Sequence, residues 1–163
     1  MIFLQSCKNI DKKPDSGLKS FLGSTIVVPQ NMEYEFDRLV KNSTNVIVII
    51  LGLEDCNECS LKNISIFKHY NSIFSLYNTN IVLITERSNQ EEITMLLNKM
   101  DINYPIIYDD NYEFINKNKL MTDPILYTFV INAKKEIIWI GSPITDSKTW
   151  DLFYKLIQKT KQR

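Results

Sequence analysis

The stretch from Asn45 to Tyr77, NVIVIILGLEDCNECSLKNISIFKHYNSIFSLY, contains three patterns in succession. Residues 46–51 form an unbroken aliphatic run, which is typical of a strand buried on both faces. A short turn-like segment follows, and then two cysteines with the spacing C-x-x-C, Cys56 and Cys59. Apolar residues then recur at helical spacing up to Tyr77. The stretch therefore predicts a buried strand, a loop that carries the cysteine pair, and an amphipathic helix.

The spacing of the two cysteines suits thiol chemistry. If the helix begins at Asp55, Cys56 takes the first helical position and Cys59 lies one turn later on the same face, so the two sulfurs can form a disulfide. The free amides and the positive dipole end of a helix favour a thiolate at Cys56, and a thiolate is the species that attacks a disulfide. Cys56 is therefore the candidate nucleophile and Cys59 the candidate resolving thiol.

Acidic residues beside the cysteines oppose thiolate formation. Asp55 and Glu58 place two carboxylates beside the cysteines, which disfavours a thiolate and points to a reducing rather than a strongly oxidising couple. The same two residues match a capping box with Asp in place of Ser or Thr, and the two roles are compatible.

Two other interpretations of the cysteine pair remain open. A C-x-x-C pair can be half of a zinc site, but the other half is missing, because the remaining thiol is Cys7 and the single histidine, His69, is on the same predicted helix. We therefore expect no metal, and we expect His69 to be solvated. The pair could also be two small residues at a helix start without any chemistry.

Composition limits the function classes. The chain has 163 residues, 44% of them hydrophobic, which suits one globular domain. The net charge is zero and no strong basic block precedes the C-terminus, which argues against a nucleic-acid partner. The four glycines form no dinucleotide-binding or P-loop motif, so nucleotide binding has no support. A reaction between thiols and disulfides needs no organic cofactor, and none is expected. The longest apolar run is too short to cross a bilayer as a helix.

The N-terminal segment contains a second motif. Leu4-Gln-Ser-Cys7 resembles a lipobox, in which a small residue precedes the cysteine that becomes lipidated. The polar tract after it reads as a tether. We therefore expect residues 1–22 to be a lipobox remnant with a flexible tether, and residues 23–163 to form the folded domain. The alternative is that Cys7 is a stray thiol in a disordered tail.

The rest of the chain predicts alternating strands and helices. Ser88 with Glu91, and Asp110 with Glu113, match capping boxes, and Asp146 is expected to start the last helix. The predicted strands cover residues 24–29, 80–85, 106–108, 126–132 and 136–140, and the predicted helical segments cover residues 32–41, 88–100, 110–120 and 146–161. This order predicts a mixed sheet with helices on both faces.

Three segments carry a resemblance to a known family: VIVIILGLEDCNECSLK (46–62), DINYPIIYDDN (101–111) and TFVINAKKEIIWIGSPI (128–144). They resemble the thioredoxin-like fold in its TlpA/redoxin-type envelope branch, and the last segment is similar to small Bacteroidetes envelope proteins. The resemblance implies an α/β fold, a three-layer α/β/α arrangement with a mixed central sheet.

The resemblance also implies a function. Members of known activity are thiol–disulfide oxidoreductases, and by position Cys56 matches the attacking cysteine and Cys59 the resolving one. The implied partners are disulfide-containing envelope proteins and a membrane thiol electron donor. The implied location is the periplasmic side of a bacterial cell envelope, with contact to the membrane only through a lipid anchor at Cys7.

The sequence departs from the family pattern at two places. Thioredoxins carry a tryptophan before the first cysteine, where this chain has Asp55. They also begin the strand that faces the disulfide with a cis-proline, whose loop contacts the substrate. Here Pro124, Ile125 and Leu126 form the corresponding segment, and Leu126 occupies the cis-proline position. A cis bond before leucine would cost about 3 kcal/mol, so a trans bond is expected.

Three functions are therefore compared. The first is an envelope thiol–disulfide reductase that uses Cys56 and Cys59. The second is a non-catalytic thioredoxin-like binding module in which the two cysteines form a structural disulfide, and the departures at Asp55 and Leu126 favour it. The third, a peroxidase-type redoxin, is the weakest, because the chain lacks the usual Thr-x-x-Cys and arginine arrangement.

Overall fold

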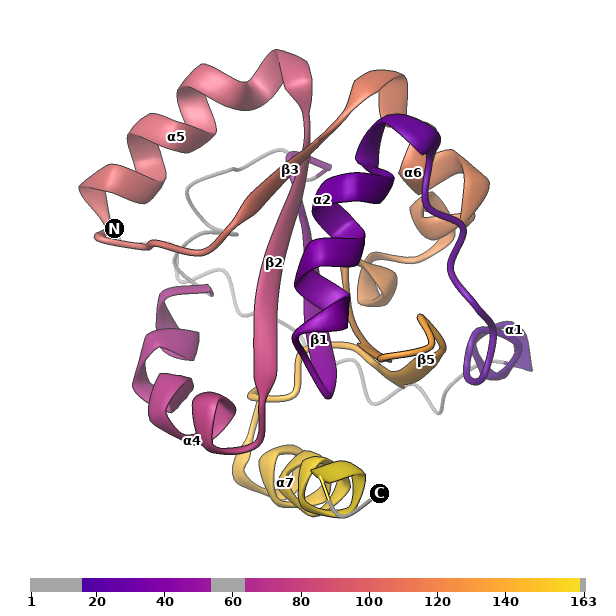
Figure 1. Cartoon of the computed structure of the whole chain (residues 1–163), viewed down its shortest axis with the longest axis vertical. Coiled ribbons are helices and arrows are strands. Elements are labelled where there is room, and N and C mark those ends of the chain that lie inside the picture. Colours follow the sequence, from indigo (N-terminus) through magenta and orange to yellow (C-terminus); the bar gives the residue numbers. More distant parts are fainter. Residues whose placement is uncertain (1–15, 54–63, 162–163) are drawn as a thin grey trace, which may run out of the picture.

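The computed structural model describes residues 16–53 and 64–161. These residues form a three-layer α/β/α arrangement around a five-stranded sheet with the strand order β3-β2-β1-β4-β5 (Figure 1). The strands are β1 Asn45–Leu51, β2 Thr79–Glu86, β3 Ile106–Asp109, β4 Thr128–Asn132 and β5 Ile137–Ile140. Strands β1, β2 and β3 run parallel, whereas β4 is antiparallel to β1 and β5 to β4. The predicted mixed sheet is thus confirmed.

Strand β1 lies at the centre of the sheet and every one of its residues is buried. Its side chains alternate between the two faces, as the period of a strand requires. Val46, Val48 and Ile50 belong to one hydrophobic cluster, and Ile47 and Ile49 to the other. The unbroken aliphatic run is therefore explained by helices on both faces of the sheet.

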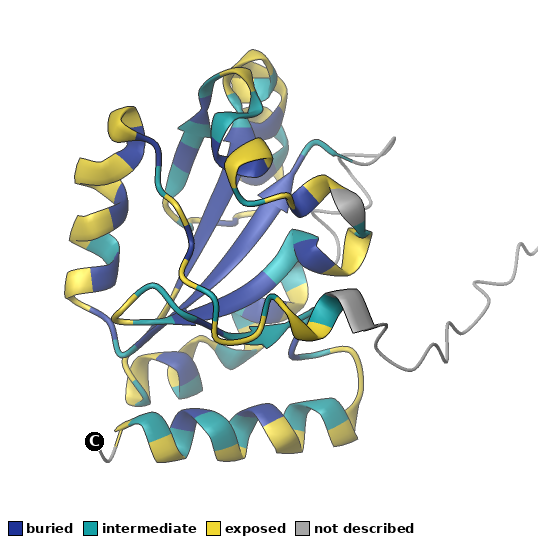
Figure 2. Cartoon of the chain, turned by 90° about the vertical axis from the view of Figure 1, so that its right-hand side faces the viewer, coloured by how far each residue is buried: buried dark blue, intermediate teal, exposed yellow. Residues whose placement is uncertain are grey.

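The helices divide between the two clusters. On one face α2 (Gln30–Lys41) and α6 (Glu113–Lys117) bury Phe36 and Phe114. On the other face α4 (Asn71–Leu76), α5 (Gln90–Lys99) and α7 (Ser147–Lys161) bury apolar residues that include Phe74 and Phe153. The helices keep exposed residues on their outer sides, whereas the central strands of the sheet are buried (Figure 2). None of the helices in the described ranges is long and apolar enough to cross a bilayer.

Several predicted boundaries are wrong for a common reason, which is that short 3₁₀ turns separate the strands from the helices. These turns are η1 Ile66–Tyr70, η2 Arg87–Asn89, η3 Asp110–Tyr112, η4 Leu120–Thr122 and η5 Pro124–Tyr127. The predicted helix up to Tyr77 is therefore interrupted by η1 before α4 begins, and the short third helix ends at Lys117 instead of Leu120. The predicted strand 126–132 begins only at Thr128, because Leu126 and Tyr127 belong to η5.

The N-terminal part of the described chain packs against the sheet. Residues 24–29 form no full strand, because only Thr25 pairs, as an isolated bridge with Glu136. Before them, α1 (Ser16–Lys19) lies beside β5 (Figure 1). Leu18 and Phe21 pack against the first hydrophobic cluster, so residues within the predicted tether contribute to the core.

Candidate functional site

The carboxyl ends of the three parallel strands meet at one edge of the sheet. Leu51 of β1 is opposite Thr85 of β2, and Glu86 of β2 is opposite Asp109 of β3. Antiparallel β4 begins at this same edge, where Thr128 pairs with Ile49. We call this region the carboxyl edge. Sites in open α/β sheets lie outside the carboxyl ends of the strands, so this edge is the candidate functional site.

The predicted thiols lie outside the described residues. This applies to Cys56 and Cys59 of the C-x-x-C pair and to Cys7 of the lipobox-like motif. The structure does describe the residues that lead to and from the pair, which are Gly52 after β1 and Ile64, a buried residue of the second cluster. The chain therefore leaves the sheet at the carboxyl edge three residues before the predicted helix start and returns into the core at Ile64.

Gly52 makes a tight exit from β1. Its φ of 80° lies in the left-handed region, which favours glycine. A Cβ at this position would lie 2.5 Å from Nδ2 of Asn89, so the backbone of Gly52 and the side chain of Asn89 are in close approach. Glycine is thus required here both for the turn and for the contact with the residue that precedes α5.

Thr85 places an unpaired hydroxyl beside this turn. The residue is completely buried, and its Oγ1 has no hydrogen-bond partner among residues 16–53 and 64–161. The same atom is 3.5 Å from the Cβ that Gly52 lacks. A buried polar atom without a partner costs free energy, so the Thr85 hydroxyl is an unusual feature of this edge. The sequence pattern alone does not predict it.

The segment Pro124–Ile125–Leu126 lies beside the start of β4. The side chain of Asp123 accepts a hydrogen bond from the Ile125 amide at 3.0 Å, and the Asp123 carbonyl accepts one from the Leu126 amide at 2.9 Å. Both amides are therefore engaged within the turn. Pro124 and Ile125 are exposed, whereas Leu126 is fully buried. Every described peptide bond is trans, so the trans bond expected before Leu126 is confirmed.

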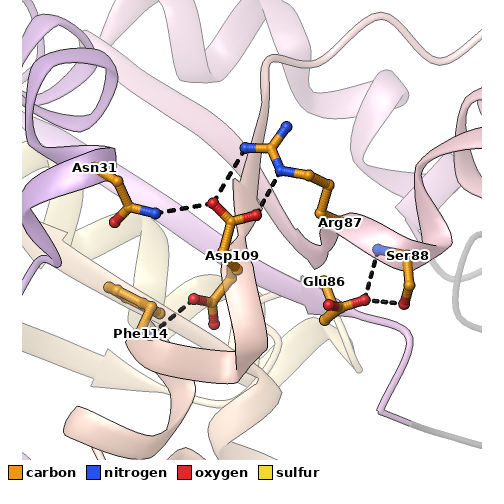
Figure 3. A network of polar contacts seen from close by, with 7 residues as sticks. Asn31, Glu86, Arg87, Ser88, Asp109 and Phe114 are labelled. Carbon is orange, nitrogen blue, oxygen red and sulfur yellow. Dashed lines mark hydrogen bonds and ion pairs between the residues drawn. The ribbon is translucent and has the colours of Figure 1, made fainter.

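A network of polar contacts joins β2, β3 and α2 at the carboxyl edge (Figure 3). Arg87 donates from Nε to Oδ1 of Asp110 at 2.5 Å, and Asn31 donates to Oδ2 of the same carboxylate at 3.1 Å. The hydrogen bond from Arg87 is the main reason why the pKa of the Asp110 carboxyl is lowered. The Arg87 guanidinium also lies 5.4 Å from the centre of the Tyr108 ring. These contacts hold the turns after β2 and β3 together.

Asp109 is the buried carboxylate of this edge. Its Oδ1 accepts from the Phe114 amide at 2.8 Å and its Oδ2 from the Ile115 amide at 3.2 Å, so it caps the start of α6. Burial raises the pKa of this carboxyl above its ordinary value, and the backbone hydrogen bonds oppose the shift. The predicted cap, Asp110, is wrong by one residue, because Asp110 instead pairs with Arg87.

The predicted cap at Ser88 is also wrong. Ser88 donates its amide to the carboxylate of Glu86 at 2.6 Å, so Glu86 caps η2, and α5 begins only at Gln90 without a side-chain cap. The cap expected at Asp146 is confirmed, because its Oδ1 accepts from the Thr149 amide at 2.9 Å. His69 is exposed, as expected.

No protein-family model and no curated protein matches the sequence. Several solved structures share its fold. An uncharacterized thioredoxin-like protein from Porphyromonas gingivalis superposes with a TM-score of 0.54 and 14% identity, over 73% of this chain and 76% of that one. A putative protein disulfide isomerase from Bacteroides thetaiotaomicron gives 0.57 and 13%, over 78% and 79%.

A third structure, the thioredoxin domain of a thiol-disulfide oxidoreductase from Bacteroides vulgatus, gives a TM-score of 0.56 and 12% identity, over 72% of this chain and 81% of that one. All three align over most of both chains. The chain therefore has the thioredoxin-like fold that its sequence resembles.

Proposed function

We propose that this chain is a thiol–disulfide oxidoreductase of the bacterial cell envelope that acts through Cys56 and Cys59. The observation that carries the proposal is the position of the pair in the sequence: Cys56 comes five residues after Leu51, the last residue of β1, and β1 ends at the carboxyl edge of a thioredoxin-like sheet. Two of the structurally similar proteins carry the names thiol-disulfide oxidoreductase and putative protein disulfide isomerase, which supports the same class of reaction.

The proposed reaction needs only the two thiols. The Cys56 thiolate attacks a substrate disulfide, forms a mixed disulfide and releases one substrate sulfur as a thiolate. The Cys59 thiolate then attacks the mixed disulfide, which releases the second substrate sulfur and leaves a Cys56–Cys59 disulfide. Two electrons pass from the protein to the substrate, and a membrane thiol donor returns them by reducing the protein disulfide.

The proposed direction is reduction of the substrate. Asp55 and Glu58 place negative charge beside the pair, which destabilises the thiolate and makes the reduced protein the better electron donor. Equilibration of the full chain with reduced and oxidised glutathione tests this direction. We expect a couple more reducing than that of glutathione, and a more oxidising couple would contradict the proposed role.

The turn before β4 limits how a substrate can be held. The amides of Ile125 and Leu126 are already bonded to Asp123, so neither is free to donate to an extended peptide. What this turn offers is apolar contact, from the exposed side chains of Pro124 and Ile125. Substrate binding at this turn is therefore proposed to rest on side-chain contact.

The same turn supports a second candidate function. If the engaged amides and the buried Leu126 prevent substrate binding altogether, the chain is a binding module and the cysteines form a structural disulfide. Such a module would contain a disulfide that resists reduction and would show no turnover.

Reduction of insulin by the full chain in the presence of dithiothreitol separates the two functions. We expect turnover by the parent protein, loss of turnover in Cys56→Ser, and a trapped mixed disulfide in Cys59→Ser. The control is Cys7→Ser, which should retain full activity because this thiol lies outside the pair. Equal turnover by the parent and Cys56→Ser would reject the enzyme proposal.

Attachment to the membrane is a separate proposal. We expect Cys7 to be lipidated, so metabolic labelling with palmitate in a bacterial host should be lost in Cys7→Ser and kept in Cys56→Ser. Labelling that persists in Cys7→Ser would reject the anchor.

A further inference from the structure

An apolar groove lies between α1, η5 and the edge strand β5. It is lined by Leu18, Lys19 and Leu22 of α1 and the following turn, by Ile125 of η5, and by residues 138–140 of β5, and it has a volume of about 350 Å³. Leu22 is 51% exposed and Ile125 is 43% exposed. Lys19 is the one charged residue among the described residues that line it.

The groove exists because β5 is an edge strand that is covered over only part of its length. The amide of Gly23 donates to the Ile137 carbonyl at 2.8 Å, and the amide of Ile137 donates to the Ser24 carbonyl at 2.9 Å. After Ile137, the three residues Ile138, Trp139 and Ile140 are only half-buried. The N-terminal segment thus covers the first part of the edge and leaves apolar side chains accessible along the rest.

The groove reaches the carboxyl edge. Ile140 pairs with Phe129 near the start of β4, and the Gly141 amide donates to the Thr128 carbonyl at 2.7 Å. A Cβ on Gly141 would lie 3.3 Å from Cγ1 of Ile125, so η5 packs directly on the end of β5. The end of β5 is two strands away from the end of β1, about 10 Å, which about three residues of extended chain can span.

We propose that this groove holds an apolar side chain of the polypeptide whose disulfide the protein reduces. This inference rests on the proposed function. The groove is at the small end of ligand sites, which span about 300–1,000 Å³, so it suits one large side chain better than a helix. Ile125 belongs both to the groove and to the turn at the carboxyl edge, so the groove is continuous with the edge at which the proposed reaction takes place.

The charge at the rim refines the substrate class. Lys19 is exposed beside an otherwise apolar lining, so it favours a carboxylate next to the bound apolar side chain. The proposed substrate segment therefore has an apolar residue about three positions from the attacked cysteine, followed by an acidic residue.

The first experiment compares three disulfides as substrates of the full chain. One is a cyclic peptide disulfide with Leu-Glu at this position, and the second is the same peptide with Ser-Lys. The third is the small aromatic disulfide 5,5′-dithiobis(2-nitrobenzoate), which has no side chain to place about 10 Å away, the spacing between the ends of β1 and β5. We expect kcat/KM to be about tenfold higher for the Leu-Glu peptide than for the Ser-Lys peptide, the discrimination that an apolar pocket gives for one side chain.

Variants locate the effect in the groove. Leu22→Glu should lower kcat/KM for the Leu-Glu peptide about tenfold and leave the rate with the aromatic disulfide unchanged. The matched control is Leu152→Glu, because Leu152 is 53% exposed on the outer face of α7 and lies outside the groove lining. Lys19→Glu should reduce the preference for the acidic peptide, and Lys155→Glu should not. Equal effects of the Leu22 and Leu152 substitutions, or none, would overturn the proposal.

A binding measurement separates failure of the groove from failure of the proposed function. In a Cys56→Ser protein with Trp150→Phe, Trp139 is the remaining tryptophan, and it lines the groove. Its emission should shift with the Leu-Glu peptide and lose this response in Leu22→Glu. If the parent reduces no disulfide but this response is present, the enzyme proposal is rejected, and the groove is still supported as a site for an apolar peptide side chain. If reduction occurs but the response is absent or independent of Leu22, the groove is rejected.

Discussion

Replacement of Asp109 should weaken the fold more than replacement of any neighbouring acid. The carboxylate is completely buried and accepts the amides of Phe114 and Ile115 at the start of α6. The turn between it and the helix passes through Asn111 and Tyr112, whose φ values of 56° and 55° are left-handed. Asp109 therefore holds a strained connection in place as well as capping a helix.

The size of the effect follows from the bonds that are lost. Asp109→Ala leaves two buried amides without an acceptor, and each unpaired amide destabilises the fold by about 1–3 kcal/mol. Part of this loss is offset, because the variant no longer buries a carboxylate. We expect a loss of about 2–4 kcal/mol in the free energy of unfolding. Asp109→Asn keeps one acceptor oxygen but turns an NH₂ group toward the second amide, so a loss of about 1–2 kcal/mol is expected.

The pH dependence gives this prediction a second test. Because burial raises the folded pKa of Asp109 above the ordinary value of 3.8, the folded protein binds the proton more tightly than the unfolded chain. The contribution of Asp109 to stability is fully present below pH 3.8 and falls as the pH rises through the folded pKa. The loss caused by Asp109→Asn should therefore be larger near pH 4 than near pH 7.

Urea unfolding followed by tryptophan fluorescence measures both quantities. Glu113→Gln is the control, because this half-exposed residue pairs with Lys117 at 2.7 Å on the surface of the same helix and should contribute only about 0.3–0.5 kcal/mol. Equal losses in Asp109→Asn and Asp109→Ala, or a loss that grows from pH 4 to pH 7, would refute the assigned hydrogen bonds or the sign of the pKa shift.

Three further predictions concern other contacts. Gly52→Ala should cost about 1–2 kcal/mol in urea unfolding because of its left-handed backbone; Asn89→Ala added to it should relieve only the close contact with the new Cβ and leave the backbone cost, and a full recovery would show that this contact is the whole cause. Asn118→Ala removes bonds of 2.7 and 2.8 Å to the backbone of Val27, so amide exchange at Val27 should accelerate about tenfold, and unchanged exchange would contradict it. Hydrogen bonds lower the pKa of Asp146 below 3.8, so the stability that Asp146→Ala removes should be present at neutral pH and should vanish as the pH falls through the folded pKa; a melting-temperature difference that stays constant with pH would contradict it.

The sheet and its layers could be predicted from the sequence because the signal is local and strong. The aliphatic runs of β1 and β2 predict buried strands, and the helical crossover between them requires parallel pairing. The segment 24–29 was the exception, because only Thr25 pairs with the sheet. Its apolar residues Ile26 and Val28 pack against the first cluster without forming a strand.

Caps were predicted less well because several polar residues compete for the same helix start. Asp109 and Asp110 are adjacent, and the capping pattern fits either one. In the structure Asp110 accepts a hydrogen bond from Arg87, whereas Asp109 accepts the helix amide of Phe114. In the same way Glu86 takes the amide of Ser88 and displaces it as a cap for α5. Sequence spacing alone contains no information on these partners.

The candidate site could be predicted only in part. The position of the C-x-x-C pair after β1 follows from the local pattern, and Cys56 and Cys59 themselves lie outside the described residues. The unpaired hydroxyl of Thr85 and the bonds from the Ile125 and Leu126 amides to Asp123 depend on how distant segments fold together. Such features have no periodic signature in a sequence.

The cover that residues 23–26 place on β5 has a consequence for solubility. Residues 23–26 bond to the first part of this edge, at Lys135 and Ile137, so a chain shortened beyond Ile26 would leave β5 uncovered along its whole length, Ile-Ile-Trp-Ile, and such edges template pairing between molecules. By covering part of β5, the N-terminal segment thus limits association between copies of the protein. Shortened versions of this protein should keep it if they are to remain monodisperse.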